Sequence, residues 1–241
     1  MIYFEQKNMN IVITGGSKGI GKAIAQKFVS NQYNVFICAR NIKQLEDTAN
    51  ELISINPKVN VFYKSVDLTE KEETESAANE ILQKMNSIDV LVNNTGTFQP
   101  GEISTEPDGI LDKMLKTNLY SAYHFSRALI PSMKQNNKGH IINICSIASL
   151  QAYKNGGAYS ISKYALLGFS KNLREELKPF NIKVTSIMPG ATMTDSWKGS
   201  GVDETKIMHP QDIAEIIWTA THLSNAALIE DIVLRPLSGD L

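Results

Sequence analysis

Short apolar runs alternate along this chain with longer segments in which apolar residues recur every three or four positions. The runs are rich in Ile and Val and are bounded by polar or turn residues, which is typical of strands buried on both faces of a sheet. Strands are therefore predicted at Ile11–Thr14, Val35–Ala39, Val59–Val66, Ile88–Asn93, His140–Ser146, Ile182–Met188 and Ile229–Leu234.

The segments between these runs have the period of an amphipathic helix. Asn41-x-x-Gln44 and Thr69-x-x-Glu72 have the spacing of capping boxes, which predicts that they open the second and third helices. Strand and helix alternate throughout, so we expect an α/β protein with a Rossmann-type, doubly wound, seven-stranded parallel sheet and helices on both faces. The apolar stripes of the six expected helices begin near Ile20, Leu45, Ala78, Leu111, Leu166 and Ile213.

These elements account for the whole chain, so we expect a single domain over residues 1–241. Residues 1–8 fit either a loose N-terminal extension or a prefix to the first strand. One long irregular stretch, residues 189–208, follows the sixth strand. Long loops in compact domains are usually functional, and doubly wound sheets bind ligands at the carboxyl ends of their strands. This stretch is therefore the expected substrate loop.

Composition narrows the classes of partner. The chain holds 24 Lys and Arg against 25 Asp and Glu, so its charge gives no reason to expect nucleic acid. No apolar stretch reaches the ~18 residues of a membrane span. Cys38 and Cys145 lie in apolar runs outside any CxxC pattern, so we expect reduced core residues rather than disulfide partners or zinc ligands. We expect a cytoplasmic protein without a metal site.

Glycines are concentrated between the first strand and the first helix, in the turn Thr14–Gly21. They permit a tight turn in which backbone N–H groups approach a pyrophosphate, beside the positive end of the helix. An ordinary glycine-rich turn is the alternative, but the position at the start of a strand–helix–strand series favours a dinucleotide site. The spacing T-G-x-x-x-G-I-G resembles the cofactor loop of the classical short-chain dehydrogenases/reductases. Expected contacts here are Gly15, Gly16, Ser17, Lys18, Gly19, Ile20 and Gly21.

The end of the second strand bears on the choice of dinucleotide. An acidic residue there would bind the adenosine ribose hydroxyls and repel a 2′-phosphate, and this chain has Arg40 instead. Arg40 and Lys18 offer a planar fork and a point charge for phosphate, which favours NADP(H) over NAD(H). The alternative is that both are solvated surface cations.

The resemblance extends to three further strand ends. Asp67-Leu68 resembles the pair that contacts adenine in the family, although Asp67 also fits a neighbour of a helix start. Asn93-Asn94-Thr95-Gly96 resembles the family's N-N-A-G, and the stretch from Pro189 to Thr194 resembles its P-G-x-x-x-T, which contacts the nicotinamide carboxamide and phosphates. A strand-ending turn is the alternative for the last motif. The implied cofactor contacts are Asp67, Leu68, Asn94, Gly96, Pro189, Gly190, Thr192 and Thr194.

Tyr159-x-x-x-Lys163 is the candidate catalytic pair. On a helix the two lie on one face, beside the apolar stripe, so both are expected to point toward the sheet. Taken alone, the pair also fits a surface lysine beside a core tyrosine. Ser146 ends the fifth strand and Asn118 lies near the centre of the fourth helix's apolar stripe; singly, they fit a turn serine and a hydrogen-bonded core asparagine. All four stand where classical family members carry their Asn–Ser–Tyr–Lys tetrad.

Hydride transfer from a nicotinamide to a ketone leaves an alkoxide that needs a proton. Tyr159 is the expected general acid, and Lys163 is expected to lower the pKa of its phenol from ~10. Ser146 is expected to donate a hydrogen bond to the substrate oxygen. Tyr159 and Lys163 are also expected cofactor contacts, since the resemblance implies that Lys163 holds the nicotinamide ribose. Asn118 is expected to hold a water that links Lys163 to solvent.

The fifth helix has a second apolar face away from its inward stripe, which suggests a subunit interface. The resemblance implies a homodimer or homotetramer formed through the helices 111–135 and 158–178. The residues of this outward face are Ile161, Tyr164, Ala165 and Leu167.

Together these features predict an NADPH-dependent oxidoreductase that reduces a carbonyl to a secondary alcohol. Substrate candidates are 3-oxoacyl thioesters, 3-oxo acids and small ketones; the alternative is a catalytically idle NADP-binding sensor or scaffold of the same fold. The 3-oxoacyl-carrier-protein reductases resemble the chain less at its C-terminus, where Ile229–Pro236 looks more like 3-hydroxy acid dehydrogenases or sepiapterin reductases. Met193, Trp197, Ile207 and Met208 fit equally an apolar lid over the substrate or anchors of the loop.

Overall fold

The computed structural model describes residues 8–197, 201 and 203–239. Within them, seven strands form a parallel sheet in the order β3-β2-β1-β4-β5-β6-β7. This order places β1 between β2 and β4, where the winding of the chain reverses, and a doubly wound sheet binds its ligand at that point. The strands are β1 Asn10–Thr14, β2 Asn34–Ala39, β3 Val61–Ser65, β4 Val90–Asn93, β5 Gly139–Ile144, β6 Ile182–Pro189 and β7 Asp231–Leu234.

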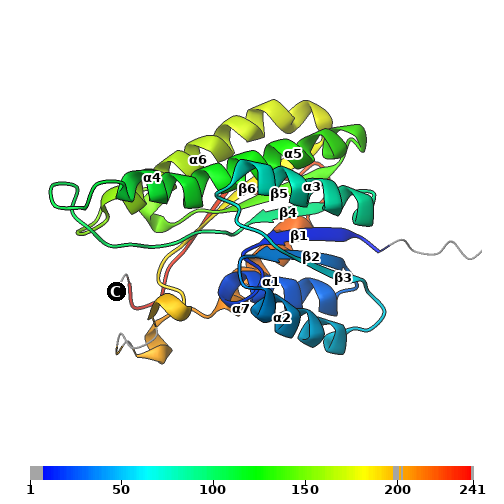
Figure 1. Ribbon diagram of the computed structural model, residues 1–241, viewed down its shortest axis with the longest axis horizontal. Helices are drawn as coiled ribbons and strands as arrows, with labels where there is room; N and C mark the ends of the chain where they lie inside the picture. Colours follow the sequence, from blue (N-terminus) through cyan, green and yellow to red (C-terminus); the bar gives the residue numbers. More distant parts are fainter. Residues whose placement is uncertain (1–7, 198–200, 202, 240–241) are drawn as a thin grey trace, which may run out of the picture.

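Helices cover both faces of the sheet (Figure 1). One face carries α1, α2 and α7, and the other carries α3, α5 and α6, with α4 beside α6. A π-helical segment, Lys116–Tyr120, joins α4 to α5, so that the three form one continuous helical stretch. The helices are α1 Gly19–Ser30, α2 Ile42–Ile55, α3 Lys71–Met85, α4 Ile110–Leu115, α5 Ser121–Gln135, α6 Gly157–Leu177 and α7 Pro210–Thr221.

Two apolar cores separate these layers. One packs α1 and α7 against the sheet around Phe28 and Ile217, and the other packs α3, α5 and α6 around Phe125 and Leu177. All five residues of β1 are buried, as expected for a central strand with a helical layer on each face. The predicted α/β class, parallel sheet and two-sided helical cover are thus confirmed.

Two details of the prediction are wrong. The strands β3 and β7 are partly exposed rather than buried on both faces, because they are the two edges of the sheet. The third helix begins at Lys71 and not at a Thr69 capping box, because the Thr69 hydroxyl donates instead to Asp67 Oδ1 at 2.8 Å. The second helix does begin as predicted, with Asn41 Oδ1 accepting from the Gln44 N–H at 3.0 Å.

The ends of the chain and its helices bear on two further expectations. Of the expected N-terminal extension, residues 1–7 lie outside the described residues. Among the residues that are described, no helix combines the length and apolar character needed to cross a bilayer. Cys38 and Cys145 are buried and unlinked, as predicted for core thiols.

Candidate active site

The glycine turn connects β1 to α1 at the carboxyl edge of the sheet. Gly15 has a φ of +64°, in the region that favours glycine. A Cβ on Gly21 would lie 2.3 Å from the Gly15 carbonyl oxygen, so only glycine fits where α1 packs on the turn. The turn also holds Gly16, Ser17, Lys18, Gly19 and Ile20. No side chain caps the start of helix α1, so its first backbone N–H groups find no side-chain acceptor on the N-cap residue Lys18.

Asn94 ties the end of β4 to this turn. Its Nδ2 donates to the carbonyl oxygens of Thr14 and Gly15 at 3.0 and 3.1 Å, and its own N–H donates to Thr14 Oγ1 at 2.9 Å. The amide group predicted to contact the cofactor therefore holds the backbone of the glycine turn in place.

The two predicted phosphate-binding cations differ in their surroundings. Lys18 Nζ forms an ion pair with Asp195 at 2.5 Å, which connects the glycine turn to the loop after β6. Arg40 is exposed just beyond β2, and its guanidinium has no ion-pair partner within the described part of the chain. Arg40 lies at the end of β2 and Lys18 in the glycine turn, as predicted, but no sequence pattern indicated the Lys18–Asp195 pair.

The other predicted cofactor residues lie along the same edge. Asp67 Oδ1 accepts from the Thr69 N–H at 3.0 Å, and Leu68 beside it is buried. Gly190 donates its N–H to the Leu234 carbonyl at 2.8 Å just after Pro189, which ends β6. Thr192 is buried, and Thr194 lies against the glycine turn, 3.4 Å from the position of a Cβ on Gly19.

The loop after β6 folds back on itself. Met193 donates its N–H to the Met208 carbonyl at 2.8 Å, and Met208 donates to the Ala191 carbonyl at 3.2 Å. Ile207 is buried and Met208 packs against the core beneath α7, so these two residues anchor the loop. Met193 and Trp197 are half-buried, which leaves a role over the substrate open to them.

Tyr159 and Lys163 lie in the first turns of α6, above the end of β5. Lys163 is 5% exposed, and its Nζ donates to the Ile144 carbonyl at 2.9 Å and lies 5.9 Å from the centre of the Tyr159 ring. Ser146 lies two residues beyond β5, and its hydroxyl is close enough to the Tyr159 phenol to lower the pKa of that group. Its Oγ also accepts from the Ala148 N–H at 3.1 Å. The structure thus brings together a serine, a tyrosine and a buried lysine.

Burial is the main cause of the pKa shifts at this site. Burial raises the pKa of the Tyr159 phenol, and the Ser146 hydroxyl opposes that rise. Burial also lowers the pKa of the Lys163 ammonium to about 8. The expected net lowering of the Tyr159 pKa is not found in this structure, because desolvation of the phenol outweighs any lowering by Lys163, whose Nζ donates to the Ile144 carbonyl.

Asn118 lies in the π-helical segment and is fully buried. Its Oδ1 accepts from the Thr97 N–H at 2.8 Å, and its Nδ2 donates to the Thr97 carbonyl at 3.0 Å and to Ser162 Oγ at 2.9 Å. A Cβ on Gly96 would lie 3.3 Å from Asn118 Oδ1 and 3.4 Å from Lys163 Nζ, so the predicted fourth member does adjoin the site. Its amide clamps the backbone after β4, and the water that it is expected to hold stays a prediction.

The comparisons with known proteins agree with this geometry. A family model described as short chain dehydrogenase matches residues 9–205. The chain belongs to this family. An uncharacterized oxidoreductase of Staphylococcus aureus (strain USA300) is 30% identical over 94% of this chain and 96% of its own. The sepiapterin reductase of Chlorobaculum tepidum is 29% identical over 96% and 97%. Among solved structures, an alcohol dehydrogenase of Thermococcus sibiricus complexed with 5-hydroxy-NADP has a TM-score of 0.88 and 27% identity, over 96% of this chain and 97% of its own.

Two residues of this short-chain dehydrogenase site were missed by the sequence analysis. Phe98 packs its ring edge-to-face against the Tyr159 ring, with centroids 4.9 Å apart and planes at 83°. Glu106 Oε1 accepts from the Ala158 N–H at 2.8 Å and so caps the start of α6. Phe98 follows the Asn93–Gly96 motif by two residues, which could have marked it. No local pattern marks Glu106, since its partner lies far along the chain.

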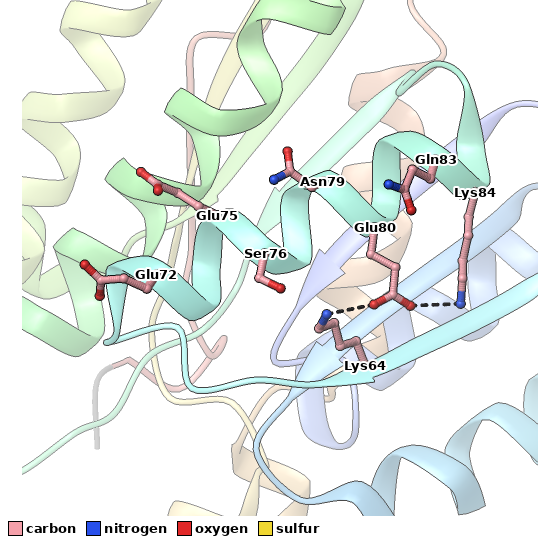
Figure 2. Close-up of a pocket in the computed structure, with 8 residues that line it drawn as sticks. All are labelled: Lys64, Glu72, Glu75, Ser76, Asn79, Glu80, Gln83 and Lys84. Carbon is pink, nitrogen blue, oxygen red and sulfur yellow. Dashed lines mark hydrogen bonds and ion pairs between the residues drawn. The ribbon is translucent and has the colours of Figure 1, made fainter.

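A shallow hollow of about 670 Å³ lies away from these residues, on α3 and β3 (Figure 2). Its lining is polar, and Glu80 pairs with both Lys64 at 2.7 Å and Lys84 at 2.9 Å. The cations that would attract an anionic ligand there are already neutralised by Glu80. None of the tetrad residues lines this hollow.

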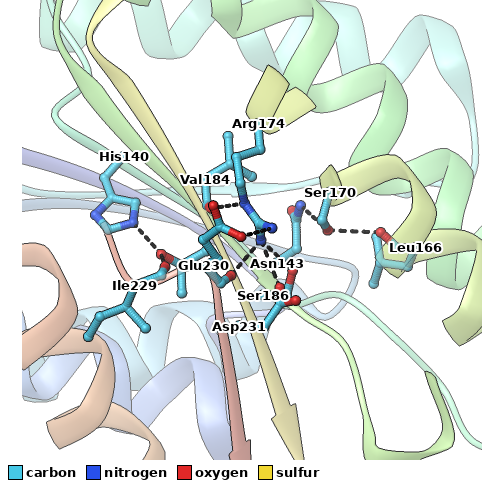
Figure 3. A network of polar contacts seen from close by, with 11 residues as sticks. His140, Asn143, Leu166, Ser170, Arg174, Val184, Ser186, Ile229, Glu230 and Asp231 are labelled. Carbon is cyan, nitrogen blue, oxygen red and sulfur yellow. Dashed lines mark hydrogen bonds and ion pairs between the residues drawn. The ribbon is translucent and has the colours of Figure 1, made fainter. Parts of the chain in front are cut away.

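Arg174, near the far end of α6, fixes this helix to the sheet (Figure 3). This buried guanidinium donates to the Val184 carbonyl at 3.0 Å, to Asp231 Oδ1 at 2.7 Å and to the Glu230 carbonyl at 2.5 Å. Asn143 in β5 donates to Ser170 Oγ of the same helix at 2.8 Å. Because buried polar groups are costly to leave unpaired, these bonds define the position of α6, and hence of Tyr159.

Proposed function

We propose that this short-chain dehydrogenase is an NADPH-dependent carbonyl reductase that forms a secondary alcohol. The observation that carries the proposal is the meeting of Ser146, Tyr159 and buried Lys163 at the carboxyl end of β5. These residues come from two elements, and a helix N-terminus and glycine turn lie along the same edge of the sheet. A merely structural tyrosine would not need a serine hydroxyl and a desolvated lysine beside it.

The nicotinamide of a bound NADPH supplies the hydride. The residues proposed to hold the dinucleotide are those of the glycine turn, with Asp67 and Leu68 near the adenine and the segment Pro189–Thr194 near the nicotinamide. Arg40 and Lys18 are proposed to bind the 2′-phosphate, since a planar fork and an ammonium suit a phosphate dianion. The NADP analogue in the Thermococcus sibiricus relative supports this choice of cofactor.

Tyr159 is proposed to give its phenolic proton to the oxygen of the reduced carbonyl. The raised pKa keeps the phenol protonated at neutral pH, which suits an acid in the reductive direction. Ser146 donates a hydrogen bond to the same oxygen as its charge grows. Lys163, with its pKa of about 8, is mostly charged at pH 7, and its field stabilises the phenolate left on Tyr159.

Substrate choice is proposed to lie with residues 189–208 and the neighbouring strand ends. The 3-oxoacyl thioesters, 3-oxo acids and small ketones remain candidates, and the sepiapterin reductase relative adds sepiapterin to them. A catalytically idle NADP-binding scaffold is the second candidate. The assembled serine, tyrosine and lysine favour the enzyme.

We also propose a homodimer or homotetramer that uses the helices 111–135 and 158–178. Exposed apolar residues lie on both helices. They are Ile161 and Tyr164 on α6, and Tyr120 and Tyr123 in the stretch 111–135. Leu167 was predicted to belong to this surface but does not, because it is buried against Ala122, Cys145 and Met188. Sedimentation of the wild type and of Tyr164→Glu tests the interface, and an unchanged mass would contradict it.

A ketone panel tests the function. The purified protein is mixed with NADPH and free 3-oxo acids, acyl thioesters or neutral ketones, and absorbance is followed at ~340 nm, while NADPH affinity is measured separately by calorimetry. Turnover of at least one class supports the reductase. Tight NADPH binding with no turnover of any class would instead support the scaffold.

A further inference from the structure

Residues 94–109, which connect β4 to α4, form one wall of the Tyr159 site. Three sets of contacts hold this connection to the π-helical segment, to the start of α6 and to the loop before α6. Asn118 binds both the N–H and the carbonyl of Thr97, Gly101 donates its N–H to the Asn155 carbonyl at 3.0 Å, and Glu106 caps Ala158. A wall that is bonded at both ends is already organised before a substrate arrives.

Phe98 is the residue that this wall presents to the catalytic tyrosine. It follows the clamped Thr97, and its ring lies edge-to-face on Tyr159 at a centroid distance of 4.9 Å. The side chain is nevertheless 46% exposed, so that much of its apolar surface is not used by the core. A half-exposed aromatic ring in contact with a catalytic phenol is available to a substrate bound there.

A second exposed aromatic residue lies near Tyr159. Tyr153, in the connection between β5 and α6, is 41% exposed. Burial raises the pKa of its phenol to about 12, and Tyr159 contributes to that rise, so the two phenols are near one another. Leu150 on the same connection is also an exposed apolar residue. Aromatic side chains from two loops, Phe98 and Tyr153, thus form an apolar rim near the Tyr159 phenol.

We propose that Phe98 is a specificity-determining residue that selects ketones carrying an uncharged aromatic ring close to the carbonyl. This inference rests on the proposed carbonyl reductase activity and narrows its substrate class. The edge-and-face charge pattern of aromatic rings gives an aryl group a further attraction to Phe98 that a saturated ring of equal size lacks. A 3-oxo acid is disfavoured, because its carboxylate would lose water against this apolar rim.

Phenylacetone and cyclohexylacetone form a matched pair of substrates for the test. In both, a methylene group separates the six-membered ring from the carbonyl, so they differ chiefly in aromaticity. We expect kcat/KM with NADPH to favour phenylacetone by roughly 3- to 10-fold in the wild type and to rank acetoacetate last. In Phe98→Leu the preference for phenylacetone should fall to about 1, and in Phe98→Tyr it should persist.

Tyr63→Leu is the control, since Tyr63 is an exposed aromatic residue on β3 and should leave the ratio unchanged. Two results would overturn the role of Phe98: a wild-type ratio near one, or a ratio unchanged in Phe98→Leu. An unchanged ratio with an equal loss of kcat/KM for both ketones would mean that Phe98 only supports Tyr159. Absence of turnover with any ketone would instead count against the reductase proposal itself.

Discussion

In the glycine turn, consecutive residues between β1 and α1 create the binding surface, and the fit is enforced by backbone contacts such as that of Gly21 with Gly15. Around Tyr159, in contrast, the side chains come from the connection after β4, the π-helical segment, the end of β5 and α6. The first region is a turn of consecutive residues, so a sequence motif can describe it. The second depends on long-range hydrogen bonds such as Asn118–Thr97 and Glu106–Ala158. The two regions should therefore respond differently to substitution.

The largest expected effect separates chemistry from cofactor binding. Tyr159→Phe removes the acidic proton and keeps the ring, so kcat should fall about 1000-fold while NADPH affinity stays within about twofold. Steady-state turnover and calorimetric titration measure the two quantities. Tyr164→Phe, an exposed tyrosine on the same helix, is the control and should retain its activity. Near-normal turnover by Tyr159→Phe would remove the general acid from the mechanism.

The glycine turn should fail in the opposite way. A methyl group on Gly21 overlaps the Gly15 carbonyl, so Gly21→Ala should cost about 3 kcal/mol of unfolding free energy and weaken NADPH binding at least tenfold. Gly168→Ala is the matched control within α6, where a Cβ meets no atom within 4 Å. That variant should gain about 0.5–1 kcal/mol from helix propensity. Urea unfolding and calorimetry report both variants, and equal behaviour of the two would contradict the close approach.

Lys163 allows the burial of the Tyr159 region to be measured by pH. Its pKa is about 8 in the folded chain and ~10.4 when unfolded, so the unfolded state binds more protons between these values. The free energy of unfolding should therefore rise with pH across this window, by about 2 kcal/mol from pH 8 to pH 10. Urea unfolding of Lys163→Met over the same pH range gives the contribution of all other titratable groups, which is then subtracted from the wild-type curve. Parallel pH curves for the two proteins would show that Lys163 is not desolvated.

The smallest expected effect concerns the dinucleotide. Arg40→Gln and Lys18→Gln should each reduce the preference for NADPH over NADH about tenfold, as loss of a charged phosphate contact weakens only the phosphorylated cofactor. The ratio of kcat/KM values for the two cofactors is the measurement. Lys58→Gln, which changes an exposed lysine elsewhere, serves as the control. If the ratio is unaffected in both variants, the two residues are ordinary surface cations.

Much of the active site could be predicted from the sequence, but not how its parts interact. The TyrxxxLys spacing and Ser146 were predicted to meet, and they do. The direction of the Tyr159 pKa shift was predicted wrongly, because it depends on how deeply Tyr159 and Lys163 are buried and on the hydrogen bond from Lys163 to the Ile144 carbonyl. Asn118 was placed correctly in the apolar stripe of its helix, whereas its partner Thr97 could not be inferred from spacing.

What the sequence by itself determined is the class of fold and the cofactor turn. Buried strands and amphipathic helices differ in hydrophobic period, and a glycine turn depends on neighbouring residues. Fold class and glycine turn can therefore be predicted from short stretches of sequence. Tertiary structure alone decided that Phe98 covers Tyr159, that Lys18 pairs with Asp195 and that Glu106 caps α6. These contacts join residues that are separated in the chain by 61, 177 and 52 positions respectively. Packing of the layers brings such residues together, and no local pattern in the sequence records it.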